Sequence, residues 1–268
     1  MRKRIQAAVL ACVAAALMTP GVAMAGVRRG EPVNDPTLTQ TAEREWREAT
    51  RRKDAEVASA TAAKNALPTG VRATASTPPY GYHTLSATNY KQEKTYYCGP
   101  ASARQSLSWH KARSGSSASL PSQGTLAGKI GTTTSGSLTT GIARALNSYN
   151  GTFGAVHYVA SNITDTGSPK TAFYTRIGWM IEDARTVPII LTATQYIPRY
   201  EGRSSRHYMS VSGIDDRTST IRMRSVDPNY DSRYRGIFWD RMGSTSSDGL
   251  CRACYKADVD GSNMAMCW

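Results

Sequence analysis

The chain has 268 residues, of which 40% are hydrophobic and 20% charged, and its net charge is +13 at pH 7. This length and composition are typical of one globular domain with shorter appendages, and they exclude a fully disordered chain. Only one apolar run approaches membrane-spanning length, which excludes multi-pass membrane proteins, and no internal repeat or collagen-like glycine period is present.

The N-terminus has the features of an export signal. Arg2–Arg4 is basic, residues 5–18 are apolar apart from one glutamine, and Ala23–Ala25 offers an A-x-A cleavage site. This pattern predicts a secretory signal peptide at residues 1–25 and a secreted, extracellular protein that keeps no stable membrane insertion once the signal is removed. A lipoprotein signal ending at Cys12 is the alternative, although the apolar stretch before that cysteine is very short.

The charge of the exported chain bears on its partners. The signal carries three of the 33 lysines and arginines and no acidic residue, so the remaining chain stays strongly basic. Because an exported protein does not meet genomic nucleic acid, we expect no nucleic-acid partner. An anionic cell wall, a surface polymer or an acidic substrate fits the charge, and simple solubility is the other interpretation.

Residues 26–81 differ in character from the rest of the exported chain. The charged stretch Thr39–Lys64 contains two Glu/Arg pairs spaced four residues apart, which favours a helix. Its apolar stripe is thin, so such a helix either docks on the rest of the protein or frays. A Pro-, Gly- and Thr-rich linker extends from Leu67 to Tyr82. We interpret residues 26–81 as a helical segment plus linker, either an inhibitory pro-segment or a stalk.

The next domain, residues 82–245, mixes helices and strands. Apolar spacing and proline placement predict helices over 98–109, 122–129, 137–147 and 168–184. Strands are expected at 155–160, 187–194, 207–214, 220–226 and 237–239. Because most helices come first and most strands come later, the pattern favours an α+β fold over an alternating α/β fold.

Cys98 is the candidate nucleophile of this domain. It begins a predicted helix, and the positive end of a helix dipole favours a thiolate. The next residue, Gly99, leaves room for a substrate to approach the backbone N–H of Cys98, an oxyanion donor. Gln92 lies six residues upstream, where its side-chain amide can fold back as a second donor. A structural thiol or a disulfide is the alternative for Cys98, and an ordinary loop amide for Gln92.

A base and its orienting group are expected from two later strands. His207 opens one strand-like run, and Asp227 ends the next, 20 positions later. If these strands pair through a hairpin around residues 215–217, the imidazole and the carboxylate lie close together, as an orienting carboxylate requires. A buried strand histidine is the alternative for His207. Asp215, Asp216, Asn229 and Asp231 compete with Asp227 for its role.

At these positions the sequence resembles the papain-like cysteine peptidases of the bacteriocin-leader-peptidase (double-glycine peptidase) type, closest to their secreted, stand-alone actinobacterial relatives. The motifs that carry the resemblance are Gln92, Cys98–Ala101, His207–Tyr208 leading to Gly213, and Asp227–Pro228. The resemblance extends over roughly residues 85–242, including 120–123 and 131–136.

The resemblance implies a papain-like α+β fold, in which an N-terminal helix carrying the cysteine packs on an antiparallel sheet carrying the histidine and aspartate. It implies that Cys98 is the nucleophile, His207 the base, Asp227 its orienting group and Gln92 the oxyanion donor. One departure is Arg206, where the family often has glycine. The chain also has no transporter domains, so cleavage after a double-glycine leader is not implied.

The remaining cysteines, Cys251, Cys254 and Cys267, crowd into residues 246–268, which we expect to form a C-terminal tail. A zinc site lacks a fourth ligand nearby, so we expect no metal and no cofactor. A disulfide that includes Cys267 is the preferred interpretation, and its pairing is open because one thiol is left over if Cys98 is free.

The sequence therefore predicts a secreted cysteine peptidase that acts on a protein or peptide substrate. An amidase or acyltransferase of cell-wall peptides with the same thiol chemistry is the first alternative. The second is an inactive peptide-binding module, suggested by Arg206, because a cation beside His207 would crowd the cleft and disfavour the imidazolium.

Overall fold

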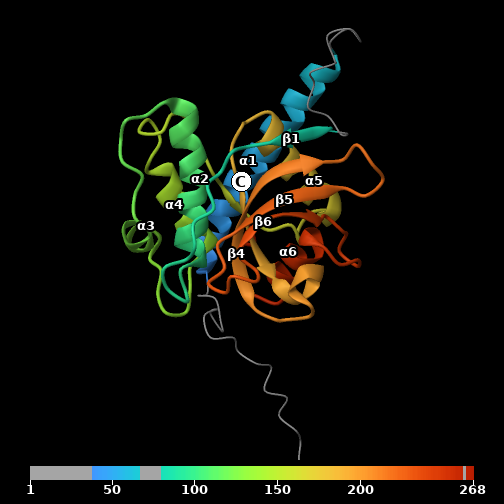
Figure 1. The fold of residues 1–268 in the computed structure, drawn as a ribbon. Coiled ribbons are helices and arrows are strands. Elements are labelled where there is room, and N and C mark those ends of the chain that lie inside the picture. Colours follow the sequence, from blue (N-terminus) through green and yellow to red (C-terminus); the bar gives the residue numbers. More distant parts are fainter. Residues whose placement is uncertain (1–37, 67–79, 262–263) are drawn as a thin grey trace, which may run out of the picture.

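One antiparallel sheet surrounded by helices is formed by residues 38–66, 80–261 and 264–268, the part of the chain that the computed structural model describes (Figure 1). The helices are α1 (Gln40–Asn65), α2 (Cys98–Ser114), α3 (Gln123–Ile130), α4 (Thr139–Asn147), α5 (Pro169–Glu182) and α6 (Leu250–Val259). The strands are β1 (Tyr82–Thr84), β2 (Ala160–Ser161), β3 (Ile189–Ala193), β4 (Arg206–Asp215), β5 (Arg222–Asp227), β6 (Gly236–Arg241) and β7 (Met266–Cys267). Two 3₁₀ helices, η2 (Thr194–Tyr196) and η3 (Pro198–Tyr200), lie between β3 and β4. The expected signal and most of the expected linker fall outside the described residues.

Strand β4 is the centre of the sheet. Within the described residues, the strand order is β2-β7-β3-β4-β5-β6, and every pairing is antiparallel. One edge of β4 is shared, because β3 pairs with its first half and β1 with its last three residues. The register with β5 shifts at a bulge between Val211 and Ile214, and such a bulge bends the strand. His207 therefore lies at the start of the most enclosed strand.

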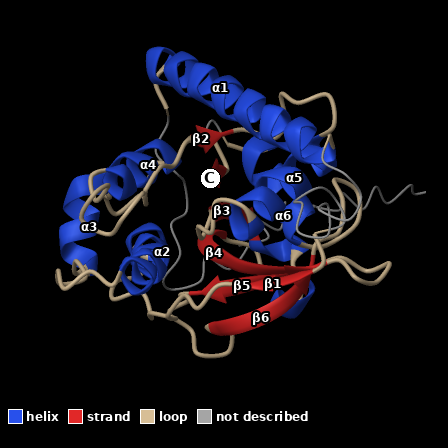
Figure 2. Cartoon of the chain, turned by 90° about the horizontal axis from the view of Figure 1, so that it is seen from above, coloured by secondary structure: helices blue, strands red, loops and turns tan. Residues whose placement is uncertain are grey.

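The helices cover the sheet from two sides (Figure 2). Helices α2, α3 and α4 gather at one side, α5 and α6 lie at the other, and α1 runs across the top beside β2. Helix α2 is fixed to β4 by Ser210, whose hydroxyl hydrogen is shared between the carbonyl oxygen of Ser102 (3.1 Å) and Oε1 of Gln105 (2.9 Å). The helix ends where Gly115 takes a positive φ of 64°, a conformation that glycine adopts without strain.

The sequence patterns predict most of these elements correctly, and the α+β fold class is confirmed. Helices α2 to α5 and strands β3 to β6 lie within a few residues of their predicted ranges. The predicted strand over 155–160 is wrong for most of its length, because only Ala160–Ser161 forms β2. The side chain of Asn147 replaces a strand partner there: its Nδ2 donates to the carbonyl of Tyr158 (2.9 Å), and its Oδ1 accepts from the N–H of Tyr158 (2.7 Å).

Helix α1 docks on the domain despite its thin apolar stripe. Thr50 Oγ1 donates to the carbonyl of Ala160 in β2 (3.1 Å). The ammonium of Lys53 is buried, donates to the carbonyl of His157 (3.2 Å) and lies 4.9 Å from the ring centre of Trp268. Burial lowers the pKa of Lys53 to about 8. These polar contacts supply the docking that the apolar pattern alone does not explain.

Residues 246–268 belong to the sheet and its cover, whereas the sequence suggested a separate tail. Helix α6 packs against β3, and β7 lies between β2 and β3. The indole of Trp268 is fully buried, and its Nε1 donates to Ser161 Oγ (2.6 Å). A two-residue strand has too little sequence for alternation to reveal it, which explains why the pattern missed β7.

The expected disulfide involving Cys267 is not formed: Cys98, Cys251, Cys254 and Cys267 are all free and buried in the structure. Burial raises the pKa of Cys251 to about 12 and the pKa values of Cys254 and Cys267 further. The three C-terminal thiols therefore behave as small apolar side chains of the core that α6 and β7 complete.

Gly178 in α5 lets the ring of Tyr80 lie directly against the helix. A Cβ at this position would be 2.1 Å from Cε2 of Tyr80. The ring is held in place, since its hydroxyl donates to the carbonyl of Thr175 (3.2 Å). We expect Gly178→Ala to lower the free energy of unfolding, measured by urea denaturation, by about 1–3 kcal/mol. The control is Gly128→Ala in α3, where a Cβ has nothing within 4 Å; equal losses in the two variants would contradict this packing.

Candidate active site

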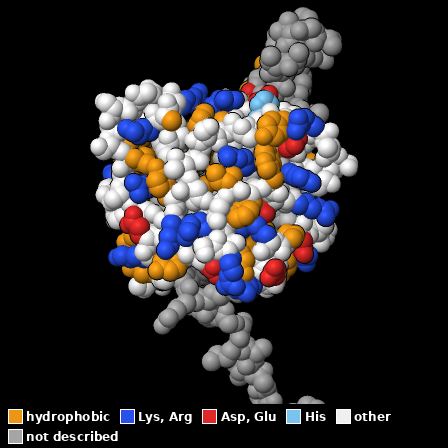
Figure 3. All heavy atoms as spheres, in the orientation of Figure 1, with side chains coloured by type: hydrophobic (Ala, Val, Ile, Leu, Met, Phe, Trp, Pro, Cys, Tyr) orange, Lys and Arg blue, Asp and Glu red, His pale blue; other side chains and the backbone are white. Residues whose placement is uncertain are grey.

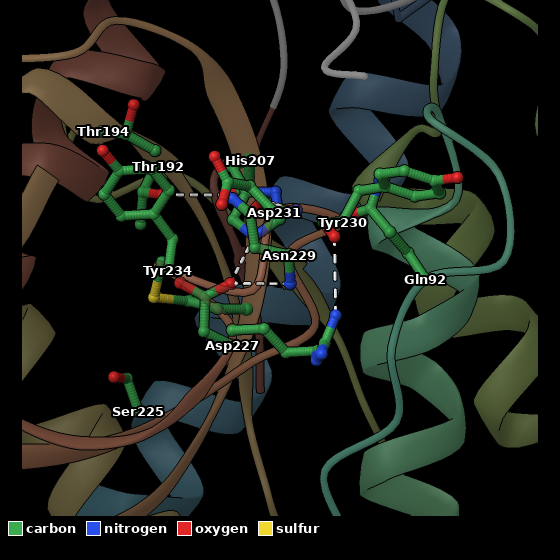
Figure 4. A network of polar contacts seen from close by, with 12 residues as sticks. Gln92, Thr192, Thr194, His207, Ser225, Asp227, Asn229, Tyr230, Asp231 and Tyr234 are labelled. Atoms are coloured by element: carbon green, nitrogen blue, oxygen red, sulfur yellow. Dashed lines mark hydrogen bonds and ion pairs between the residues drawn. The ribbon is translucent and has the colours of Figure 1, made fainter. Parts of the chain in front are cut away.

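His207 and Asp227 meet at the ends of two paired strands, as the hairpin between them predicts. The imidazole Nε2 lies 2.8 Å from Asp227 Oδ1, and both side chains are fully buried. Figure 4 shows His207, Asp227 and Asn229 together at the strand ends, with Gln92 nearby on the segment that leads to α2. The bond to Asp227 engages Nε2 of the imidazole.

The surroundings of Asp227 stabilise its charged form. Burial disfavours the charge, but the positive charges of His207 and Arg199, with hydrogen bonds from His207 and Tyr200, lower the pKa of Asp227 to about 2. Its Oδ1 also accepts the backbone N–H of Asn229 (3.0 Å). The carboxylate is therefore ionised at neutral pH, and it fixes both the orientation and the tautomer of the imidazole.

Cys98 is the first residue of α2, and its side chain is buried with 1% of the residue exposed. Tyr97 precedes it as the N-cap without a capping side-chain bond, and Pro100 has no N–H to satisfy. Helix α2 packs on β4, the strand that begins with Arg206 and His207. The structure thus places the two residues on neighbouring elements, and the approach of the Cys98 thiol to the imidazole stays a prediction.

The segment before Cys98 is tied to the strand end that carries Asp227. The backbone N–H of Gln92 donates to the carbonyl of Pro228 (2.8 Å), and Nδ2 of Asn89 donates to the carbonyl of Asp227 (3.2 Å). The Gln92 amide donates to the carbonyls of Lys94 (3.0 Å) and Thr95 (2.9 Å). To serve as an oxyanion donor, it has to exchange one of these bonds for a bond to the substrate.

The structure gives a different reason for glycine at position 99 from the one expected from the sequence. A Cβ at Gly99 would lie 2.4 Å from Oγ and 2.8 Å from Cβ of Ser137. Ser137 is itself held, because the hydroxyl of Tyr208, next to His207, donates to its carbonyl (3.1 Å). The glycine therefore serves close packing between the first turn of α2 and the segment before α4, where the sequence suggested open space for a substrate.

Gly99→Ala is expected to displace either Ser137 or the first turn of α2, which carries Cys98. Misplacing a reacting group by about 1 Å can cost about 100-fold in rate, so we expect a drop in kcat/KM of that order if the protein is a peptidase. Ser137→Gly in the same chain removes the clashing atoms and should restore part of the rate. A single variant Gly99→Ala with undiminished kcat/KM would contradict this account.

Arg206 lies away from the imidazole although it precedes His207 in the chain. Successive side chains of a strand point to opposite faces of the sheet. The guanidinium of Arg206 follows this rule and donates to the carbonyl of Ala257 near the end of α6 (3.0 Å). It therefore contacts the end of α6, and the reason for suspecting an inactive site at this position no longer holds.

Two residues that the sequence did not suggest complete the surroundings of Asp227. Nη2 of Arg199 and the hydroxyl of Tyr200 each lie 2.7 Å from Oδ2 of Asp227. Gln123, which lies in the 120–123 stretch of the resemblance, holds the segment before Cys98. Its Oε1 accepts from the N–H of Glu93 (3.0 Å), and its Nε2 donates to the carbonyl of Lys91 (2.7 Å). Arg199 and Tyr200 follow Pro198 in the 3₁₀ helix η3, a three-residue element that carries no motif.

The other histidines lie in settings unlike that of His207. His110 is buried beside the hydroxyl of Tyr158 (2.9 Å), and burial lowers its pKa to about 4. In the described part of the chain, no three His, Cys, Asp or Glu side chains are grouped as a metal site requires. None of the helices in residues 38–66, 80–261 and 264–268 combines the length and apolar character needed to cross a membrane.

A model of the Peptidase_C39 like family matches residues 84–247. The chain belongs to this family. The matched range contains Gln92, Cys98, His207 and Asp227, so the resemblance drawn from these motifs is confirmed, together with the papain-like fold class. Family membership relates the chain to the cysteine peptidases, and the separate roles of the four residues stay predictions.

The comparison with solved structures includes the crystal structure of UfSP from C. elegans, which is 14% identical, with a TM-score of 0.38. The match covers 63% of this chain and 30% of that one, so the chain corresponds to less than a third of the length of that protein. No curated protein matches the sequence.

Proposed function

We propose that this protein is a secreted cysteine peptidase that hydrolyses peptide bonds with Cys98 as nucleophile, His207 as base and acid, and Asp227 as orienting group. The observation that carries the proposal is the buried bond between His207 Nε2 and Asp227 Oδ1, formed in a member of the Peptidase_C39 like family. Export rests on the pattern of residues 1–25.

In the first step, the Cys98 thiolate attacks the peptide carbonyl while His207 is the imidazolium. The new C–S bond gives a tetrahedral intermediate whose oxyanion accepts the N–H of Cys98 and, as the second donor, the Gln92 amide. The imidazolium then gives a proton to the leaving amine as the C–N bond breaks, which leaves a thioester on Cys98.

In the second step, water attacks the thioester, and His207 takes its proton. The C–S bond breaks, the peptide acid leaves, and the Cys98 thiolate and the imidazolium form again. Asp227 keeps its charge throughout, because its partners hold its pKa near 2. Its part is to hold Nε2 so that Nδ1 faces the reaction.

The class of substrate is tested by offering two kinds of substrate to the chain without residues 1–25: an unfolded protein and a set of muropeptides. The chain is basic, and Figure 3 shows Lys and Arg side chains spread over one face. This charge would help to attract muropeptides. We expect new amino termini from the unfolded protein and an acyl group on Cys98 after acid quenching. Cleavage of muropeptides alone would favour the wall amidase, and no cleavage of either by fully reduced protein would favour an inactive binding module.

A further inference from the structure

The two oxygens of the Asp227 carboxylate have separate sets of partners. Oδ1 lies 2.8 Å from His207 Nε2 and accepts the N–H of Asn229 (3.0 Å). Oδ2 accepts from Arg199 Nη2 and from the Tyr200 hydroxyl, each at 2.7 Å. Arg199 therefore neutralises the same carboxylate that is expected to stabilise a positive charge on His207.

Arg199 is shared with a second carboxylate, that of Asp240 in β6. Its Nε lies 3.1 Å from both oxygens of Asp240, whose Oδ2 also accepts the hydroxyl of Ser225 (2.5 Å). Asp240 is 7% exposed, so water screens this pair only weakly. The guanidinium is further held by a bond from Nη1 to the carbonyl of Tyr234 (3.1 Å), which prevents it from turning towards one carboxylate alone.

The charges of this cluster do not cancel unless His207 is protonated. Two carboxylates and one guanidinium give a net charge of minus one, and the imidazolium brings the sum to zero. Without Asp240, Arg199 would balance Asp227. In a chain without the Cys98 thiol, an imidazolium at His207 would then be an uncompensated buried charge, which is strongly disfavoured.

The other ionisable groups around the cluster add no net negative charge. The carboxylate of Asp231, in the loop after Asp227, is paired with Arg233 (2.6 Å). Tyr200 of η3 stacks on Tyr234 of the loop before β6, with ring centres 4.6 Å apart. Two guanidinium groups, of Arg203 and Arg233, lie over the Tyr234 ring at 5.4 and 5.5 Å. On the proposed function, the thiolate of Cys98 approaches from α2 on the Nδ1 side.

We propose that Asp240, acting through Arg199, is a positioning residue that keeps His207 protonated at neutral pH and so maintains the thiolate–imidazolium pair. The catalytic relevance of this inference rests on the proposed function, whereas the charge relation itself does not. The test therefore measures the protonation of His207 directly, in chains that carry Cys98→Ala so that no thiol interferes.

The measurement is the titration midpoint of the His207 imidazole, monitored by NMR in the otherwise complete chain. We expect Asp240→Asn to lower the midpoint by about one pH unit, a tenfold loss of proton affinity, because the cluster then lacks its net negative charge. Asp240→Glu keeps the charge and should restore the midpoint. Asp248→Asn, which removes an exposed carboxylate paired with Arg252, should leave it unchanged.

A second variant, in which the midpoint of His207 is expected to shift in the opposite direction, keeps the inference testable if Asp240→Asn fails to fold. Arg199→Gln removes the positive charge and should raise the midpoint of His207, whereas general damage to the site would move both variants in the same direction. Midpoints that stay within about 0.2 units in both variants, or that shift with the same sign, would overturn the inference.

The measurements of activity and of protonation separate the two proposals. If the parent chain with Cys98 hydrolyses no peptide but the midpoints shift as expected, the peptidase proposal fails and the charge relation stands. If the parent chain hydrolyses peptides and the midpoints do not move, the peptidase proposal stands, and the inference about Asp240 and Arg199 is overturned.

Discussion

Replacing Cys98 by alanine is expected to lower the turnover of a peptide substrate by on the order of 10⁴-fold or more, because no other group forms the thioester. Stability should change little. The substitution removes one buried sulfur atom, which costs about 1 kcal/mol of the free energy of unfolding. The measurements are kcat on the unfolded-protein substrate and a urea denaturation curve for each variant.

Cys251→Ala is the matched control for this change, since Cys251 is equally buried but lies in α6. It should lose similar stability and keep its turnover. Undiminished hydrolysis by Cys98→Ala would end the proposal that Cys98 is the nucleophile, and equal losses of turnover in the two variants would show that the effect comes from core packing.

Asp227→Asn is expected to be damaging to both activity and stability. Activity should fall by about 10⁴-fold, because an amide no longer selects the tautomer of His207. Stability should fall by about 3–5 kcal/mol, since a buried charge pair loses one partner. Asp248→Asn, at an exposed pair with Arg252, should cost about 1 kcal/mol or less.

The stability lost in Asp227→Asn should be greatest near neutral pH and become smaller in acid. The pKa of Asp227 is lowered to about 2 in the folded chain, against about 3.9 in an unfolded chain. A carboxylate with a lowered pKa stabilises the fold fully above its unfolded value and loses that contribution as the pH falls through its folded value. The gap between parent and variant should therefore be full above about pH 4 and narrow as the pH falls through 2. A gap that stays constant down to that pH would contradict the ionised, paired state of Asp227.

Local sequence patterns were sufficient for most of the fold. The helix beginning at Cys98 is predicted by a proline in its first turn, and the meeting of His207 with Asp227 by two strand-like runs joined by a hairpin. Helix α6 was missed because residues 246–268 were expected to form a tail. The missed strands are too short to show a local pattern. Strand β1 has three residues and β7 has two, and both form only because the sheet supplies their partners.

The residues of the candidate site also fall into those that local patterns predicted and those that they did not. The residues expected to react lie at element ends, where motifs mark them, whereas the residues that hold them are distant in sequence. Arg199 and Asp240 are 28 and 13 positions from Asp227 and come from the short 3₁₀ helix η3 and the edge strand β6. The packing role of Gly99 depends on its contact with Ser137. No spacing rule predicts this contact, because the two residues lie in different segments.

The central claim, that Cys98 and His207 form an ion pair, is tested most directly by the rate of Cys98 alkylation with iodoacetamide as a function of pH. The buried thiols of Cys251, Cys254 and Cys267, with their raised pKa values, should label slowly, and peptide mapping identifies the site. The account predicts fast labelling of Cys98 at about pH 5–6 that is lost in His207→Ala. Slow labelling that tracks the titration of an ordinary cysteine near ~8.5, unchanged in His207→Ala, would contradict it.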